Sequence, residues 1–147
     1  MGKLKSKIDI LRDELDLILP EIKQDKLNIL IIDDETKNLK SFKGLFRREF
    51  NVITATNLDE AVFSVKNNKI DFVFCDYLLK DNTGAEILEE IVSLKPNIKR
   101  ACLTAFDTEI HRLELLNKSN TRHVLNKPAR FNEIMNVMIN YNNPVYQ

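Results

Sequence analysis

Four strand-like apolar runs in this chain end in polar side chains. In chain order, the groups that close these runs are Asp33 with Asp34 and Glu35, then Asp76, Thr104 and Lys127. If the strands are parallel, their carboxyl ends share one edge of the sheet, which is where such sheets bind ligands. The pattern therefore predicts a parallel sheet whose edge carries an acidic pocket with one lysine and one hydroxyl group.

The apolar runs alternate with segments of helical period from residue 27 onward, and this alternation is typical of βαβ units. The strands are expected at residues 27–32, 51–55, 71–75, 99–103 and 122–126. The helices that follow them are expected to bury Leu39, Phe42, Leu45 and Phe46, then Ala61, Val62 and Val65, then Ile87, Ile91 and Leu94, then Ile110, Leu113 and Leu116, and last Phe131, Ile134 and Met138. Asn57 with Glu60 and Thr83 with Glu86 have the spacing of capping boxes at two helix starts. We therefore expect an α/β protein.

The length and the charge of the chain limit the number of domains and the kinds of partner that can be expected. The 147 residues suit a single domain, and 22 basic residues balance 22 acidic ones. No overall charge favours nucleic acid or an anionic membrane, and no run is long enough to span a membrane. Charged residues interrupt the start of the chain, where a signal peptide would need an apolar segment. We therefore expect a cytoplasmic protein with no nucleic-acid or membrane partner.

Cysteine and glycine usage agrees with this interpretation. Cys75 and Cys102 lie inside expected strands, where a free cysteine behaves as a small apolar residue, and this favours a reduced, cytoplasmic setting. Gly2, Gly44 and Gly84 are too widely spaced for a glycine-rich phosphate loop. A nucleotide site of the P-loop or dinucleotide kind is therefore not expected.

Residues 1–25 stand outside the alternation of strands and helices. Apolar residues recur there with the spacing of a coiled-coil seam, at Leu4, Ile8, Leu11, Leu15 and Ile18. Pro20 is expected to end or kink this helix. Two interpretations remain open: an amphipathic helix folded onto its own domain, or a helix that dimerises.

The carboxylates at the strand ends predict a metal site. A helix cap would explain one aspartate, but it does not explain a pair together with Asp76. Three converging carboxylates repel one another, and a hard divalent cation with oxygen ligands relieves that repulsion. Mg²⁺ suits such a site because it accepts phosphate oxygens beside a few carboxylates. Lys127 and Thr104 would then bind the oxygens of a phosphoryl group.

These residues together resemble the receiver domain of two-component response regulators. The resemblance rests on Asp33-Asp34, Asp76, Gly84 eight residues later, Leu103-Thr104-Ala105 and Lys127-Pro128, and it covers about residues 27–140. It implies a flavodoxin-like, doubly wound, five-stranded parallel sheet of strand order 2-1-3-4-5 with five flanking helices. The extra helix would occupy residues 1–25, the receiver domain residues 26–143, and a tail residues 144–147.

The resemblance also implies a role for each residue. Asp76 would accept a phosphoryl group from a phosphohistidine of a sensor histidine kinase or of a histidine phosphotransfer protein. Asp34, Asp76 and the backbone carbonyl of Leu78 would hold Mg²⁺, with Asp33 acting through water. Lys127 and Thr104 would bind phosphoryl oxygens, and Thr104 would shift the helix after residue 108, the last strand and the last helix. We therefore expect a signalling module rather than an enzyme. This module could dimerise through the surface formed by that helix, the last strand and the last helix, or through residues 1–25.

Two positions depart from the family pattern. Receivers commonly carry an aromatic residue three positions before the lysine, whereas this chain has Val124. Strand alternation points the neighbouring His123 to the opposite face, so it is expected to be a surface or packing residue. The frequent proline four residues after the phosphoacceptor is replaced by Lys80.

Three other functions agree less well with the sequence. A receiver-like interaction module without phosphorylation would not need the full set of site residues. An aspartyl-phosphate hydrolase is suggested by the sequence Asp81-Asn82-Thr83-Gly84, but Asp81 lies in a polar loop rather than at a strand end. A DNA-binding regulator would need a further motif, and residues 141–147 are too few for a helix-turn-helix.

Overall fold

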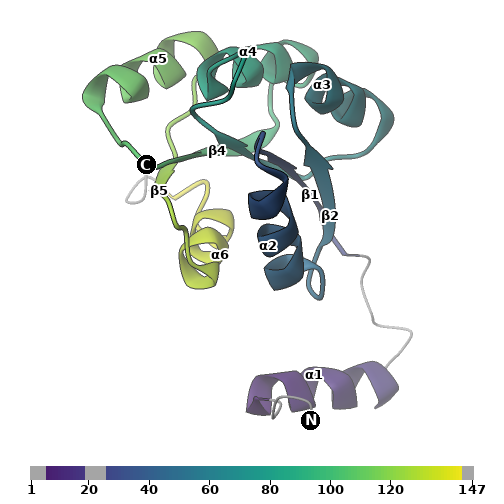
Figure 1. Cartoon of the computed structure of the whole chain (residues 1–147). Coiled ribbons are helices and arrows are strands. Elements are labelled where there is room, and N and C mark those ends of the chain that lie inside the picture. Colours follow the sequence, from purple (N-terminus) through teal and green to yellow (C-terminus); the bar gives the residue numbers. More distant parts are fainter. Residues whose placement is uncertain (1–5, 19–25, 144–147) are drawn as a thin grey trace.

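The computed structural model describes residues 6–18 and 26–143 (Figure 1). Its five strands are β1 (Asn28–Ile32), β2 (Asn51–Ala55), β3 (Phe72–Asp76), β4 (Lys99–Thr104) and β5 (Val124–Asn126). They form one sheet of order β2-β1-β3-β4-β5 in which every pair is parallel. The predicted fold and strand order are therefore confirmed.

Helices cover both faces of this sheet (Figure 1). Their bounds are α1 (Lys7–Ile18), α2 (Thr36–Phe46), α3 (Leu58–Asn67), α4 (Gly84–Leu94), α5 (Glu109–Ser119) and α6 (Phe131–Ile139). Helices α3, α4 and α5 lie on one face, and α2 and α6 on the other. Strand side chains alternate between the two cores: Leu30 and Ile32 join the first, and Ile29 and Ile31 the second.

The helix starts follow the predicted local signals. The side chain of Asn57 accepts a hydrogen bond from the Glu60 amide at 2.9 Å, and that of Thr83 from the Glu86 amide at 3.2 Å. Each bond satisfies an amide that the first turn of a helix leaves without a partner. The Thr83 cap fixes the point at which α4 begins after β3.

The buried face of α5 differs from the prediction. Ile110, Leu113 and Leu116 were expected inside, but they are 75%, 50% and 39% exposed. The face that packs inward contains Leu115 and Ser119 instead. Ser119 can lie inside because its hydroxyl bonds to the Leu115 carbonyl and to Thr121, so apolar periodicity selected the wrong face of this helix.

Two other apolar side chains were also wrongly placed in the core. Leu45 of α2 is 56% exposed and Leu94 of α4 is 37% exposed. Both lie in the last turn of their helices. The remaining predicted core positions of these two helices are buried or partly buried.

Helix α1 lies apart from the sheet, beyond the end of α2 (Figure 1). Arg48, which follows α2, connects α1 to the domain through ion pairs with Asp9 at 3.3 Å and Asp13 at 2.6 Å. Ile8 and Leu11 of the predicted seam are 61% and 58% exposed. The predictions for Leu4, Pro20 and residues 144–147, and for the side chains of Leu15 and Ile18, fall outside the described residues. Within the described part of the chain, no helix is long and apolar enough to cross a membrane.

Candidate functional site

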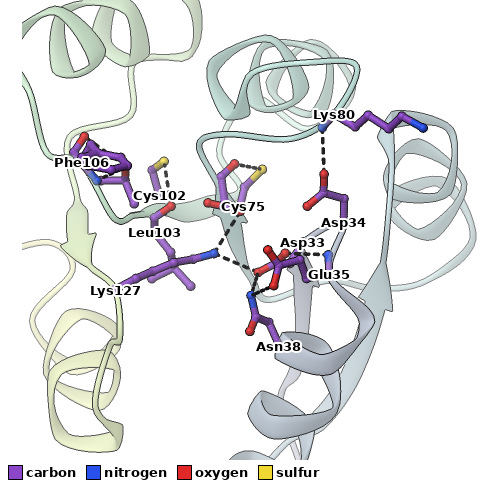
Figure 2. A network of polar contacts seen from close by, with 12 residues as sticks. Asp33, Asp34, Glu35, Asn38, Cys75, Lys80, Cys102, Leu103, Phe106 and Lys127 are labelled. Carbon is purple, nitrogen blue, oxygen red and sulfur yellow. Dashed lines mark hydrogen bonds and ion pairs between the residues drawn. The ribbon is translucent and has the colours of Figure 1, made fainter.

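The carboxyl edge of the sheet brings four separate chain segments together (Figure 2). Asp33 directly follows β1, Asp76 ends β3, Thr104 ends β4, and Lys127 directly follows β5. Parallel pairing keeps these ends level, since Asp76 lies opposite Leu103 and Thr104 opposite Asn126. The predicted gathering of these groups at one edge is therefore observed.

Lys127 lies between two buried carboxylates. Its Nζ is 3.0 Å from Oδ2 of Asp33 and 3.0 Å from Oδ2 of Asp76. Asp33 also accepts hydrogen bonds from the Glu35 amide at 2.9 Å and from the Asn38 side chain at 3.2 Å. These donors fix the Asp33 carboxylate, whereas the Asp76 carboxylate pairs with Lys127.

The acidic groups could hold a cation together. Asp33, Asp34 and Asp76 each offer a carboxylate oxygen, and these oxygens lie within 4.8 Å of one another. With the ammonium of Lys127, the cluster carries one positive charge against three negative ones. A divalent cation would balance this charge, and carboxylate oxygens are the ligands that Mg²⁺ prefers. The donor set therefore fits Mg²⁺.

Burial and ion pairing together set the protonation of Asp76 and Lys127. The burial of Asp76 raises the pKa of its carboxyl group, and Lys127 offsets only part of that effect. Burial pushes the pKa of Lys127 down, but its bonds to Asp33 and Asp76 outweigh burial and raise that pKa overall. Lys127 is therefore firmly protonated, and the carboxylate of Asp76 would gain from a further cation.

Asp34 is exposed and faces the loop after β3 (Figure 2). Its Oδ2 accepts a hydrogen bond from the Lys80 amide at 2.8 Å. The same loop contains Leu78, which is 52% exposed and bridges to Thr83. Asp81 is also exposed, and it lies outside the acidic cluster, so the loop position that suggested a hydrolase has no place in the site.

Gly84 allows the start of α4 to approach the end of β3 closely. Its amide donates to the Tyr77 carbonyl at 2.6 Å. A Cβ atom at this position would lie 2.4 Å from the carbonyl oxygen of Asp76 and 2.9 Å from the Cα of Tyr77. Both obstacles are backbone atoms, so only glycine fits here without displacing Asp76.

The hydroxyl of Thr104 is engaged with the loop that follows it. It donates to the Phe106 carbonyl at 3.2 Å and accepts from the Phe106 amide at 3.1 Å. Thr104 is only 2% exposed. Its hydroxyl would have to leave the Phe106 carbonyl in order to donate to any group bound at Asp76.

The residues that depart from the family pattern have ordinary surroundings. Val124 is partly buried, and His123 is 7% exposed with its ring 4.5 Å from that of Tyr141. His123 is thus a packing residue, as predicted.

Cys75 and Cys102 are fully buried, and this burial raises the pKa of both thiols, so neither is a nucleophile at neutral pH.

The sequence did not reveal some contacts of the site. Asn38 lies in the first turn of α2, and a helical asparagine carries no signal that it will bond to Asp33. The contact of Lys80 with Asp34 uses a backbone amide, which any residue could supply. Tyr77, beside Asp76, donates its hydroxyl hydrogen to Glu114 of α5, and only the tertiary structure shows this pairing.

Comparison with known proteins identifies one family. The sequence profile of the response regulator receiver domain matches residues 29–139. Among curated proteins, the transcriptional regulatory protein ZraR of Salmonella typhimurium is 29% identical over 114 residues, which is 77% of this chain and 26% of ZraR. The hydrogenase transcriptional regulatory protein HoxA of Cupriavidus necator is 25% identical over 68% of this chain and 21% of HoxA. The chain thus spans about a quarter of the length of these relatives.

Solved structures of similar fold include three response regulators. A two-component response regulator from Clostridium difficile matches with a TM-score of 0.70 at 26% identity, over 79% of this chain and 94% of that one. A response regulator from Burkholderia pseudomallei, with a phosphorylated aspartic acid, calcium ion and citrate, gives 0.68 at 28% identity, over 76% and 65%. A CheY-like receiver domain from Methanospirillum hungatei gives 0.73 at 24% identity, over 80% and 94%, which supports the fold alone.

Proposed function

The chain belongs to the response regulator receiver domain family, and from this premise we propose that it is the phosphoacceptor of a two-component phosphorelay, modified on Asp76. The observation that carries the proposal is the position of Asp76 at a strand end, 3.0 Å from Lys127 and grouped with Asp33 and Asp34. A receiver-like module without phosphorylation would have no need of this arrangement.

The chemistry asks little of the protein beyond positioning and charge neutralisation. A carboxylate oxygen of Asp76 attacks phosphorus, the new O–P bond forms, and the P–N bond of the donor phosphohistidine breaks. Lys127 lies close enough to Asp76 to neutralise a phosphoryl oxygen. Asp76 needs no general base because its reacting form is the carboxylate.

The metal site is part of the same proposal. Asp34, Asp76 and the backbone carbonyl of Leu78 would hold Mg²⁺, with Asp33 acting through water. When bound, Mg²⁺ supplies positive charge that offsets the charge on the phosphoryl oxygens. The calcium ion and phosphorylated aspartic acid of the Burkholderia pseudomallei protein support this assignment.

The output surface is assigned to α5, β5 and α6. Thr104 ends β4, and its hydroxyl would turn from Phe106 to the phosphoryl group, which changes the loop that leads into α5. This loop and α5 carry four exposed apolar side chains, Phe106, Ile110, Leu113 and Leu116. We propose that a target protein or a second copy of the chain binds there after phosphorylation.

The partners follow from the family. Residues 26–143 would act as the receiver unit, with a sensor histidine kinase or a histidine phosphotransfer protein as phosphoryl donor, in the cytoplasm, and without turnover of a substrate of its own. We also propose a homodimer through α1. The expectation of no nucleic-acid partner is not supported, because the curated relatives are transcriptional regulators.

Intact-mass measurement with acetyl phosphate and Mg²⁺ tests this function. The native chain is expected to gain one phosphoryl group, and Asp76→Asn is expected to gain none. Asp81→Asn is the matched control, because Asp81 is an exposed aspartate of the adjoining loop, and it should behave as the native chain does. Labelling of Asp76→Asn with loss of labelling in Asp81→Asn would move the function to the loop.

A further inference from the structure

The Phe106 carbonyl is held from two sides. The Thr104 hydroxyl donates to it at 3.2 Å, and Nδ1 of His111 lies 3.2 Å from the same oxygen. A carbonyl can only accept, so Nδ1 of His111 carries the hydrogen of this bond. Thr104 and His111 therefore hold the loop between β4 and α5 in one arrangement together.

His111 is itself held by the residue that follows the phosphoacceptor. Its ring stacks on that of Tyr77, with 4.0 Å between centroids and 22° between planes. Tyr77 is 2% exposed, and its hydroxyl donates to Glu114, one turn further along α5. Lys118 pairs with the same carboxylate at 3.1 Å. These contacts join the end of β3 to the first turns of α5.

We propose that His111 and Tyr77 are positioning residues that hold the loop between β4 and α5 in its unphosphorylated arrangement and so set how readily Thr104 is released to the phosphoryl group. This inference rests on the proposed function of Asp76. Thr104 has one hydrogen to donate, so it cannot bond to a phosphoryl oxygen and to the Phe106 carbonyl at once. Every contact that keeps the carbonyl in place therefore favours the unphosphorylated arrangement.

Val124 of β5 gives a reason why a link from Tyr77 to α5 would matter for signalling. Val124 cannot swing between two positions as an aromatic side chain would, so coupling between Thr104 and the output surface needs another route. The contacts of Tyr77 with His111 and Glu114 supply one, because they connect the phosphoacceptor segment to α5 directly.

Initial rates of phosphorylation by acetyl phosphate with Mg²⁺, followed by intact mass, test the inference. His111→Phe keeps a ring to stack on Tyr77 but removes the donor to Phe106. The loss of one such bond predicts a rate about two- to tenfold higher. Tyr77→Phe, which keeps the stack and loses only the bond to Glu114, should give a smaller rise. Asn117→Ala is the matched control on α5, since Asn117 is exposed and outside these contacts.

A second measurement separates positioning from a general structural effect. The Phe106 amide donates to Thr104 at 3.1 Å, so its NMR resonance reports the loop. In His111→Phe without any phosphoryl donor, this resonance should move part of the way to its position in the native chain with BeF₃⁻ and Mg²⁺. An unchanged rate with an unmoved resonance would overturn the inference while leaving the proposed function intact. Failure of the native chain to gain a phosphoryl group would instead remove the proposed function.

Discussion

Gly84 is the residue whose replacement tests the geometry of the site most simply. A Cβ atom there would lie 2.4 Å from the Asp76 carbonyl oxygen, and a backbone atom cannot move aside cheaply. We expect Gly84→Ala to lower the free energy of unfolding by about 1–3 kcal/mol, as overpacking usually does, and to slow phosphorylation of the displaced Asp76. Urea unfolding measures the first effect.

Gly44→Ala is the matched control for Gly84→Ala. Gly44 lies in α2, and a Cβ atom there would have no neighbour within 4 Å. Alanine is the better helix former, so this substitution should raise the free energy of unfolding by ~0.5–1 kcal/mol. Equal effects of the two substitutions would contradict the close approach at Gly84.

His123 predicts a pH dependence of stability. Burial lowers its pKa below the usual value of 6.5, against the bond to the Tyr141 carbonyl, which raises it. As the pH falls below 6.5, the unfolded chain binds a proton before the folded chain does, so the folded state loses stability. The loss continues until the pH reaches the lower pKa of the folded state.

Denaturant unfolding across this pH range, compared between the native chain and His123→Leu, measures the effect. The native chain is expected to lose more stability than the variant as the pH falls through 6.5. Parallel curves for the two proteins would show that His123 titrates alike in both states, which contradicts its burial.

Residue types at strand ends could be predicted from sequence, but their partners could not. Asp33, Asp76, Thr104 and Lys127 were predicted because parallel strands bring their ends to one edge. Asn38 and His111 were missed because their contacts depend on how α2 and α5 are turned relative to the sheet. The direction of the Thr104 hydroxyl toward Phe106 likewise follows from a loop conformation that no periodicity encodes.

At the scale of elements, α1 presents a face that the domain does not cover. Asp9 and Asp13, four residues apart on one side of the helix, pair with Arg48. The exposed Ile8 and Leu11 are three residues apart on another side. The described ion pairs with the domain are therefore polar, and of the predicted seam Ile8 and Leu11 are exposed; we propose that a second copy of the chain covers them.

Sedimentation equilibrium tests association through α1. The native chain should show a mass that rises with concentration, and the association should be weak because a helix of fewer than ~12–15 residues is marginal alone. Leu11→Lys should abolish it. Ile10→Lys is the control, because Ile10 is 45% exposed and does not belong to the predicted seam. A native chain that stays monomeric at all concentrations would contradict the expectation, as would equal effects of the two lysines.

Strands were predicted better than helix faces. Buried parallel strands are continuous apolar runs, so the starts and ends of the first four were placed to within one residue. The face of α5 was wrong because Ser119 is buried through hydrogen bonds while Leu113 is exposed. Hydrophobic periodicity cannot distinguish a core face from an exposed face when both carry leucines.

At the scale of the whole molecule, the fold and the position of the site follow from one property of the sequence, the alternation of apolar runs with helical segments. The meeting of Asp33, Asp76 and Lys127 at one edge depends on this alternation, whereas the strand order was implied by the resemblance to receiver domains. The balanced net charge gave no guide to partners. The informative charges are instead local, because three carboxylates and the ammonium group of Lys127 lie together at that edge.

The central claim is that this edge binds Mg²⁺ and takes a phosphoryl group on Asp76, and a structure of the chain with Mg²⁺ and BeF₃⁻, which mimics a phosphoryl group, tests it most directly. We predict beryllium bonded to the Asp76 carboxylate, the metal ion beside Asp34 and Asp76, and the Thr104 hydroxyl turned from the Phe106 carbonyl to a fluorine atom. Beryllium fluoride bound elsewhere, or a metal ion remote from Asp34 and Asp76, would contradict the account.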